Sequence, residues 1–152
     1  MLRGQYPLRF YQEELLGRAL FSGHFKNGKI LAGAFIVKDP SKGISVNRLK
    51  FAPRCQMDFL SKANAQRRTA NFRKKNSNAP ETNFYGYASI KTKEVSCIRL
   101  DKGKTLGLKV TPKFGNPFHA DITLPVGESK DFYLKIADEL LKKAKFQEPL
   151  KQ

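Results

Sequence analysis

The chain has 152 residues and a formal net charge of +16, the balance of 29 Lys and Arg residues against 13 Asp and Glu residues. This length predicts one domain over residues 1–152, and a hydrophobic content of 40% is enough to form a core, which excludes a disordered protein. The longest apolar run, residues 30–37, is far too short to cross a bilayer, so no membrane-spanning helix is expected.

In the first third of the chain, the apolar pattern predicts one helix and two strands. An apolar stripe with helical spacing favours a helix over residues 11–21. A continuous apolar run predicts a strand over residues 29–37, and a turn containing Pro and Gly at residues 39–43 ends it. A short strand over residues 44–49 is expected to follow that turn.

The middle of the chain is strongly basic. Between Arg48 and Lys75 there are nine Lys and Arg residues, and Asp58 is the one acidic residue. Several alanines favour a helix from residue 57 to residue 75, with Asp58 as a candidate cap, while large apolar residues are few. We therefore predict an exposed basic helix followed by a flexible loop, together spanning about residues 57–80.

Four strands are predicted after this basic segment. Residues 84–91 and 94–100 are expected to pair with each other across a short turn. Residues 106–110 and 120–124 alternate apolar and polar side chains, and the turn between them predicts a hairpin.

Near the C-terminus, apolar residues recur at three- and four-residue steps between Phe132 and Ala144, which predicts an amphipathic helix. Ser129 is its expected N-cap, and Pro149 marks its limit. The whole pattern predicts an α+β fold, a mainly antiparallel sheet with about three helices.

The basic segment is the first candidate site. Five cationic residues fall within nine positions, with Asn and Gln between them: Arg67, Arg68, Arg73, Lys74 and Lys75. Such residues neutralise phosphates, and the amides can contact bases. With Lys109 and Lys113 extending the track, the sequence predicts a nucleic-acid-binding protein, with RNA favoured over DNA, working alone or in a ribonucleoprotein or defence complex. The alternative for this segment is a solvated basic helix.

Aromatic residues on the sheet could assist binding. If residues 84–91 form a regular strand, Tyr85 and Tyr87 project from the same face. Exposed tyrosines there would stack on bases, and the alternative is packing within the core.

The two histidines support an enzymatic alternative, a metal-independent ribonuclease of toxin type. His119 would act as general acid or base, because its pKa lies near neutrality, and Asp121 on the same strand face would orient it. His24, in an expected loop, is the second candidate. No metal or cofactor is predicted, and a third alternative is a module that binds an acidic protein.

A third cluster is polar. Ser45 and Arg48 lie on one expected strand and could form a pocket for a phosphate or a ribose. The Ala-Phe pair, the Ser-Val pair with Arg48, and the downstream Asn-Pro-x-His-Ala pattern resemble a group of small uncharacterised bacterial proteins. The resemblance implies that Ser45, Arg48, Asn116 and His119 belong to one site, and it implies no activity.

Two features of the sequence bear on the cellular compartment in which the protein is expected. Cys55 and Cys97 lie far apart and form no Cys-x-x-Cys pattern, which favours two reduced thiols. Residues 1–7 do not contain the apolar stretch of a secretory signal. A cytoplasmic protein is therefore expected.

Overall fold

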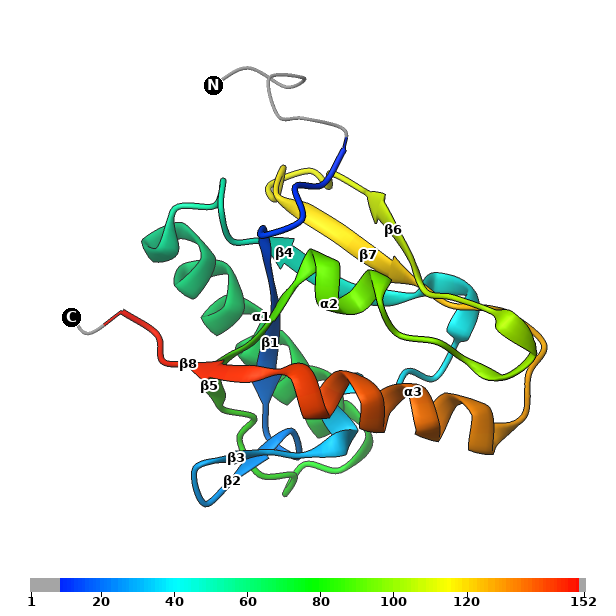
Figure 1. Cartoon of the computed structure of the whole chain (residues 1–152). Coiled ribbons are helices and arrows are strands. Elements are labelled where there is room, and N and C mark those ends of the chain that lie inside the picture. Colours follow the sequence, from blue (N-terminus) through cyan, green and yellow to red (C-terminus); the bar gives the residue numbers. More distant parts are fainter. Residues whose placement is uncertain (1–8, 151–152) are drawn as a thin grey trace.

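A six-stranded sheet forms the framework of the protein in the computed structural model, which describes residues 9–150 (Figure 1). The strand order is β6-β7-β4-β1-β5-β8, and every neighbouring pair is antiparallel. These strands are β1 (Leu15–Phe21), β4 (Ile44–Arg48), β5 (Phe84–Lys91), β6 (Gly107–Val110), β7 (His119–Thr123) and β8 (Lys145–Gln147).

Three α-helices and a small hairpin complete the fold, which confirms the predicted α+β class. The helices are α1 (Arg54–Lys75), α2 (Thr92–Ser96) and α3 (Lys130–Lys143), and the hairpin pairs β2 (Phe25–Lys26) with β3 (Lys29–Ile30). Short 3-10 turns cover Ala32–Phe35, Pro40–Lys42 and Asp101–Gly103. In the part of the chain that the structure describes, no helix has the length and apolar character needed to cross a membrane. Residues 1–7 lie outside the described residues.

The two faces of the sheet differ in how much apolar surface they bury. On one face, α3 and the first 3-10 turn pack on the main core, whose most buried members include Leu20, Ile44, Ile122, Ile136 and Leu140. On the other face, α1 packs on a much smaller cluster of Ala52, Met57, Tyr87 and Phe118. The rest of the space between α1 and the sheet is lined by a mixture of polar and apolar side chains.

Helix α1 is held to the sheet by hydrogen bonds as well as by this small cluster. The buried Tyr87 hydroxyl of β5 donates to Asp58 Oδ1 over 2.7 Å, and the Leu150 N–H donates to Asp58 Oδ2 over 2.8 Å. At the far end of the helix, the Thr82 N–H donates to Thr69 Oγ1. The prediction that Asp58 caps the helix is therefore wrong, because α1 begins four residues earlier and the carboxylate faces the sheet.

Three predicted elements are wrong. The expected helix at residues 11–21 is strand β1, and the expected strand at residues 94–100 begins as helix α2. The expected strand at residues 29–37 is reduced to Lys29–Ile30, followed by a 3-10 turn. By contrast, the short strand after residue 43, the β6–β7 hairpin, the basic helix and the C-terminal helix are confirmed, and Ser129 caps α3 by accepting from the Phe132 N–H.

The two tyrosines of β5 do not share a face. The pairing of β1 with β5 shifts register next to Gly86, whose φ is +139°. A Cβ at Gly86 would lie 2.4 Å from the Gln147 carbonyl oxygen, so this position requires glycine. Tyr87 is buried under α1, while Tyr85 packs beside Phe25 at the edge of the main core. The two tyrosines therefore form no common stacking surface, and the packing expected as the alternative is confirmed.

Candidate functional site

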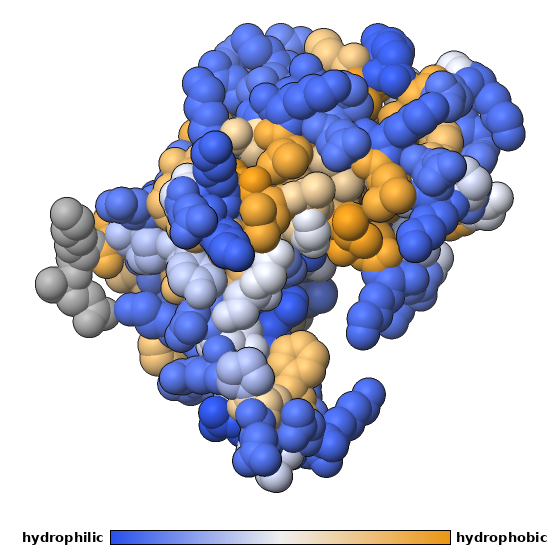
Figure 2. Space-filling model, turned by 90° about the horizontal axis from the view of Figure 1, so that it is seen from below, coloured by the Kyte–Doolittle hydropathy of each residue, from blue (hydrophilic) through white to orange (hydrophobic). Residues whose placement is uncertain are grey.

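A cleft of about 440 Å³ lies between α1 and the sheet. Its lining comes from α1, from the central strands β1 and β4, and from the turn between β6 and β7. Figure 2, which views the molecule from below, shows a hollow between two masses, with hydrophilic residues along much of its border. The cleft occupies the space that the small apolar contact under α1 leaves unfilled.

Arg18 forms part of the wall on the sheet side. Strands β1 and β4 pair at Leu16 with Arg48 and at Gly17 with Asn47. Beyond that point the Arg18 side chain connects the strands, because its Nε donates to the Ala34 carbonyl and its Nη1 to the Ser45 carbonyl, each over 3.0 Å. These two bonds fix the guanidinium in the wall of the cleft.

The charge on Arg18 is poorly compensated by the protein. Its pKa is lowered from 12.5 to about 10, mainly by burial and in part by the neighbouring Arg68 cation, while Asp121 opposes the shift. A guanidinium that has lost its hydration water and lies near a like charge is stabilised when an anion approaches it. The wall around Arg18 is therefore suited to an anionic group.

Helix α1 supplies the opposite wall. Asn64, Arg67, Arg68 and Asn71 line the cleft, and their spacing of three and four residues places them along one side of the helix. The Arg68 guanidinium lies 4.3 Å from the centre of the Phe21 ring, a cation–π contact that holds it near Arg18. Burial lowers the pKa of Arg68 as well.

His119 lies in the cleft wall on β7, and its tautomer follows from its partners. Its Nδ1 is 3.0 Å from the Thr111 carbonyl oxygen, which can only accept, so Nδ1 carries a proton. The Thr111 hydroxyl donates to Asp121 Oδ2 and accepts from Nδ1. In the neutral ring the lone pair therefore sits on Nε2, which is buried and has no hydrogen-bond partner among the described residues.

The electrostatic surroundings favour the neutral form of this ring. Burial lowers the pKa of His119 below its usual 6.5, and the Lys113 cation adds to the effect. Asp121 opposes the shift, with Oδ1 at 4.0 Å from Nε2. His119 is thus a buried polar group held in one orientation at the wall of a cationic cleft, where its unpartnered nitrogen would gain from a hydrogen-bond donor.

The turn between β6 and β7 forms the rim. The Lys113 and Asn116 backbones exchange hydrogen bonds of 3.0 and 2.9 Å, which closes a two-residue turn over Phe114 and Gly115. Asn116 Nδ2 also donates to Asn47 Oδ1 over 2.8 Å, so the turn is tied to β4. This arrangement places Lys113 and Phe114 at the edge of the cleft.

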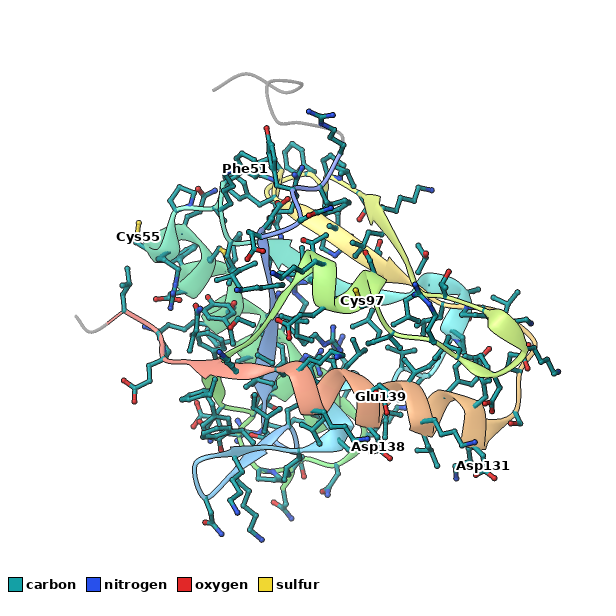
Figure 3. All side chains as sticks on the ribbon, in the orientation of Figure 1. Phe51, Cys55, Cys97, Asp131, Asp138 and Glu139 are labelled. Carbon is teal, nitrogen blue, oxygen red and sulfur yellow. The ribbon has the colours of Figure 1, made fainter. Side chains whose placement is uncertain are left out.

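The distribution of charge distinguishes this side of the molecule. Four cationic residues line the cleft (Arg18, Arg67, Arg68 and Lys113), and none of the described residues in its lining is acidic. The acidic residue of α1, Asp58, is buried and hydrogen-bonded to Tyr87. Asp131, Asp138 and Glu139 lie along α3, which packs on the other face of the sheet (Figure 3).

The structure brings several sequence-predicted site residues together and separates others. Those lining the cleft are Ser45, Arg67, Arg68, Lys113, Asn116 and His119. Asp121 does not line the cleft, but it accepts a hydrogen bond from the Thr111 hydroxyl, which also contacts the His119 ring. Lys109 lies on the edge strand β6, where it pairs with Asp121. The last three cationic residues of the predicted basic cluster lie at the exposed C-terminal end of α1, outside the cleft lining: Arg73, Lys74 and Lys75.

Arg48 has a different place from the one implied by the resemblance. Its side chain is buried and forms an ion pair with Glu14, with Nε at 2.6 Å from Oε1. The guanidinium also lies between the rings of Phe10 and Phe51. It is not among the residues that line the cleft, so its contacts are those of a structural ion pair.

His24 lies outside the cleft lining, and its Nδ1 accepts from the Phe21 N–H over 3.1 Å. Its pKa is lowered from 6.5 to about 4, mainly by burial and in part by the nearby Arg18 and Arg68 cations. The ring therefore stays neutral at pH 7 and closes the turn after β1. The structure does not assemble His24 and His119 as two lining residues of the same cleft.

We expect protonation of His24 to destabilise the fold. Between pH 6.5 and pH 4 the unfolded chain binds a proton that the folded chain does not, so the free energy of unfolding decreases as the pH falls through this window. Because the ring is only half-buried, the decrease is about 1–2 kcal/mol. His24→Asn, whose amide oxygen can accept from the Phe21 N–H, should lose this part of the pH dependence. Urea unfolding of both proteins at neutral and mildly acidic pH measures it, and identical pH profiles would contradict the assignment.

The sequence pattern missed two lining residues that matter here. Arg18 fell inside a predicted helix, where a charged residue draws no attention, although a lone Arg between Leu16 and Leu20 is a signal on a central strand. Phe114 lies in a predicted turn, and the turn pattern gives no sign that its ring lines a cleft. Comparisons of the chain with protein-family models, curated proteins and solved structures found no match.

Proposed function

We propose that this protein binds nucleic acid in the cleft between α1 and the sheet, with RNA favoured over DNA. The observation that carries the proposal is the convergence of cations from three separate elements, β1, α1 and the β6–β7 turn, on one cleft without an acidic lining residue among the described positions. Cations held this way by the fold are suited to a chain of phosphates.

The polar residues between the cations support a nucleic acid over a simple anion. Asn64 and Asn71 flank Arg67 and Arg68 along α1, and amide groups can donate to and accept from base edges and ribose hydroxyls. A cleft of about 440 Å³ has the size of a small-ligand site and is suited to separate nucleotides of a flexible strand. Proteins that recognise RNA by sequence mostly bind such unpaired segments, which favours RNA.

The first test neutralises the cations of α1. Arg67→Gln combined with Arg68→Gln should weaken binding of single-stranded RNA by about three- to tenfold at moderate salt. The plot of log affinity against log salt should become less steep by about 1–1.5, because two phosphate contacts are lost. Fluorescence anisotropy with a labelled oligonucleotide at several salt concentrations measures both quantities.

The control removes the same charge elsewhere. Lys26 and Lys29 are exposed in the β2–β3 hairpin and do not line the cleft, so Lys26→Gln with Lys29→Gln should retain the affinity and nearly all of the salt slope. Equal losses in both double variants would mean that only net charge matters and would overturn the cleft assignment. Cleavage of the RNA in the presence of EDTA would favour the ribonuclease alternative, and no affinity for any nucleic acid would favour an acidic protein partner.

A further inference from the structure

The most exposed large hydrophobic side chain of the described residues stands at the rim of the cationic cleft. Phe114 is 98% exposed, although apolar side chains of this size are usually at least partly covered. It lines the cleft beside Lys113 and Asn116. Its ring therefore adds little to the folded core and is available to a ligand.

The backbone that carries Phe114 is held in place. Lys113 and Asn116 exchange two backbone hydrogen bonds across the turn, and the Phe118 N–H donates to Asn116 Oδ1. Gly115 has a φ of +80°, which allows the chain to turn tightly immediately after the aromatic residue. Because the turn is fixed before binding, the ring can pack on a ligand at a small entropic cost.

We propose that Phe114 is the stacking platform for one unpaired base of a strand whose phosphates occupy the cleft. The inference rests on the proposed function and adds to it that the ligand is single-stranded at this position. An aromatic face next to several fixed cations matches a nucleotide, which joins a flat base to a phosphate. A base within a duplex is already stacked on both faces, so it cannot cover the Phe114 ring without leaving the helix.

The absence of tryptophan from the sequence provides a specific probe. Phe114→Trp introduces a single indole at the proposed contact, and a stacked base should quench its fluorescence during titration with a single-stranded RNA. The matched control is Phe59→Trp, because Phe59 is 73% exposed on α1 and does not line the cleft. A duplex of the same sequence should quench neither protein strongly. Equal quenching of the two tryptophans by the single strand would overturn the inference.

A second measurement tests the contribution of the ring to affinity. Phe114→Ala should weaken binding of single-stranded RNA by about five- to a hundredfold at constant salt, while leaving the salt slope unchanged. Phe114→Tyr keeps an aromatic face and should restore the affinity. Phe59→Ala, which removes another exposed ring outside the cleft lining, should bind like the unmodified protein.

The outcomes separate this inference from the function on which it rests. If Phe114→Ala binds normally while the Arg67 and Arg68 double variant binds weakly, the stacking role is wrong and nucleic-acid binding stands. If the unmodified protein has no affinity for RNA or DNA, both proposals fail. An affinity for duplex equal to that for a single strand would also overturn the stacking role.

Discussion

Replacing Glu14 by Ala is expected to lower the free energy of unfolding by about 3–5 kcal/mol, the usual cost of breaking a buried ion pair. Glu14 and Arg48 meet through two hydrogen bonds, Nε to Oε1 at 2.6 Å and Nη2 to Oε2 at 3.0 Å. Their side chains are 0% and 1% exposed. Removing the carboxylate leaves the guanidinium buried without its counter-charge.

The surroundings of the pair explain why the loss is hard to repair. Arg48 also donates to the Arg9 carbonyl and lies between the rings of Phe10 and Phe51. These contacts hold the charged group in place, so water cannot readily reach it after the substitution. The Glu14 carboxylate also accepts from the Tyr11 N–H. Together with the ion pair to Arg48, this bond connects the segment before β1 to strand β4. The variant therefore loses both charge compensation and a connection between two parts of the chain.

Urea unfolding followed by circular dichroism measures the effect. Glu13→Ala is the control, because Glu13 is the adjacent residue and its ion pairs with Lys91 and Lys93 are exposed, so its unfolding midpoint should barely change. The double replacement Glu14→Leu with Arg48→Met should be less destabilising than Glu14→Ala alone, because no unpaired charge remains. A midpoint for Glu14→Ala like that of Glu13→Ala would contradict the structural role of the pair.

Packing between residues far apart in the sequence explains why these elements were wrongly predicted. Strand β1 is central in the sheet, and residues on both of its faces are covered, so its apolar residues do not alternate as they do in a half-exposed strand. The chain leaves β5 at Lys91 to form α2, where the Glu94 side chain accepts from the Lys91 N–H and Thr92 donates to the Glu14 carbonyl, a contact between residues far apart in sequence. The β6–β7 hairpin and α3 were predictable, because apolar and polar residues follow the period of the element in each and a local turn or cap bounds it.

The residues of the candidate site also fall into two groups, those that local sequence predicts and those that only long-range packing places. Arg67 and Arg68 were predictable from local charge density, and Lys113 and Asn116 from a recognisable turn. The sequence could not show that the helix packs over β1 and β4, and so it could not show that Arg18 faces Arg68. The same limit applies to Arg48, whose place in a polar cluster of the sequence gave no sign of its partner Glu14. Local sequence patterns thus identified candidate binding residues, while long-range packing determined which of these residues line the same cleft.

We expect Arg18→Gln to have the largest effect on binding of any single charge substitution, a loss of affinity for single-stranded RNA of about ten- to a hundredfold. Arg67 is exposed and Arg68 is less buried than Arg18, so water and salt screen both more strongly, whereas the pKa of Arg18 is lowered to about 10, mainly by burial. A desolvated cation interacts more strongly with a phosphate than an exposed one does. Its bonds to the carbonyls of Ala34 and Ser45 use two of the five N–H donors of the guanidinium, and the remaining donors are available to a ligand.

Arg99→Gln is the matched control for this prediction. Arg99 is exposed, donates through Nη1 to the Ser96 carbonyl and does not line the cleft, so the substitution removes the same charge and a comparable backbone contact elsewhere. Arg18→Lys keeps the charge without the planar group and should give an intermediate affinity. Thermal unfolding of each variant separates a loss of fold from a loss of binding. If Arg18→Gln remains folded and binds RNA as tightly as Arg99→Gln does, the anion does not reach the wall of the cleft, and the phosphates follow only the exposed surface of α1.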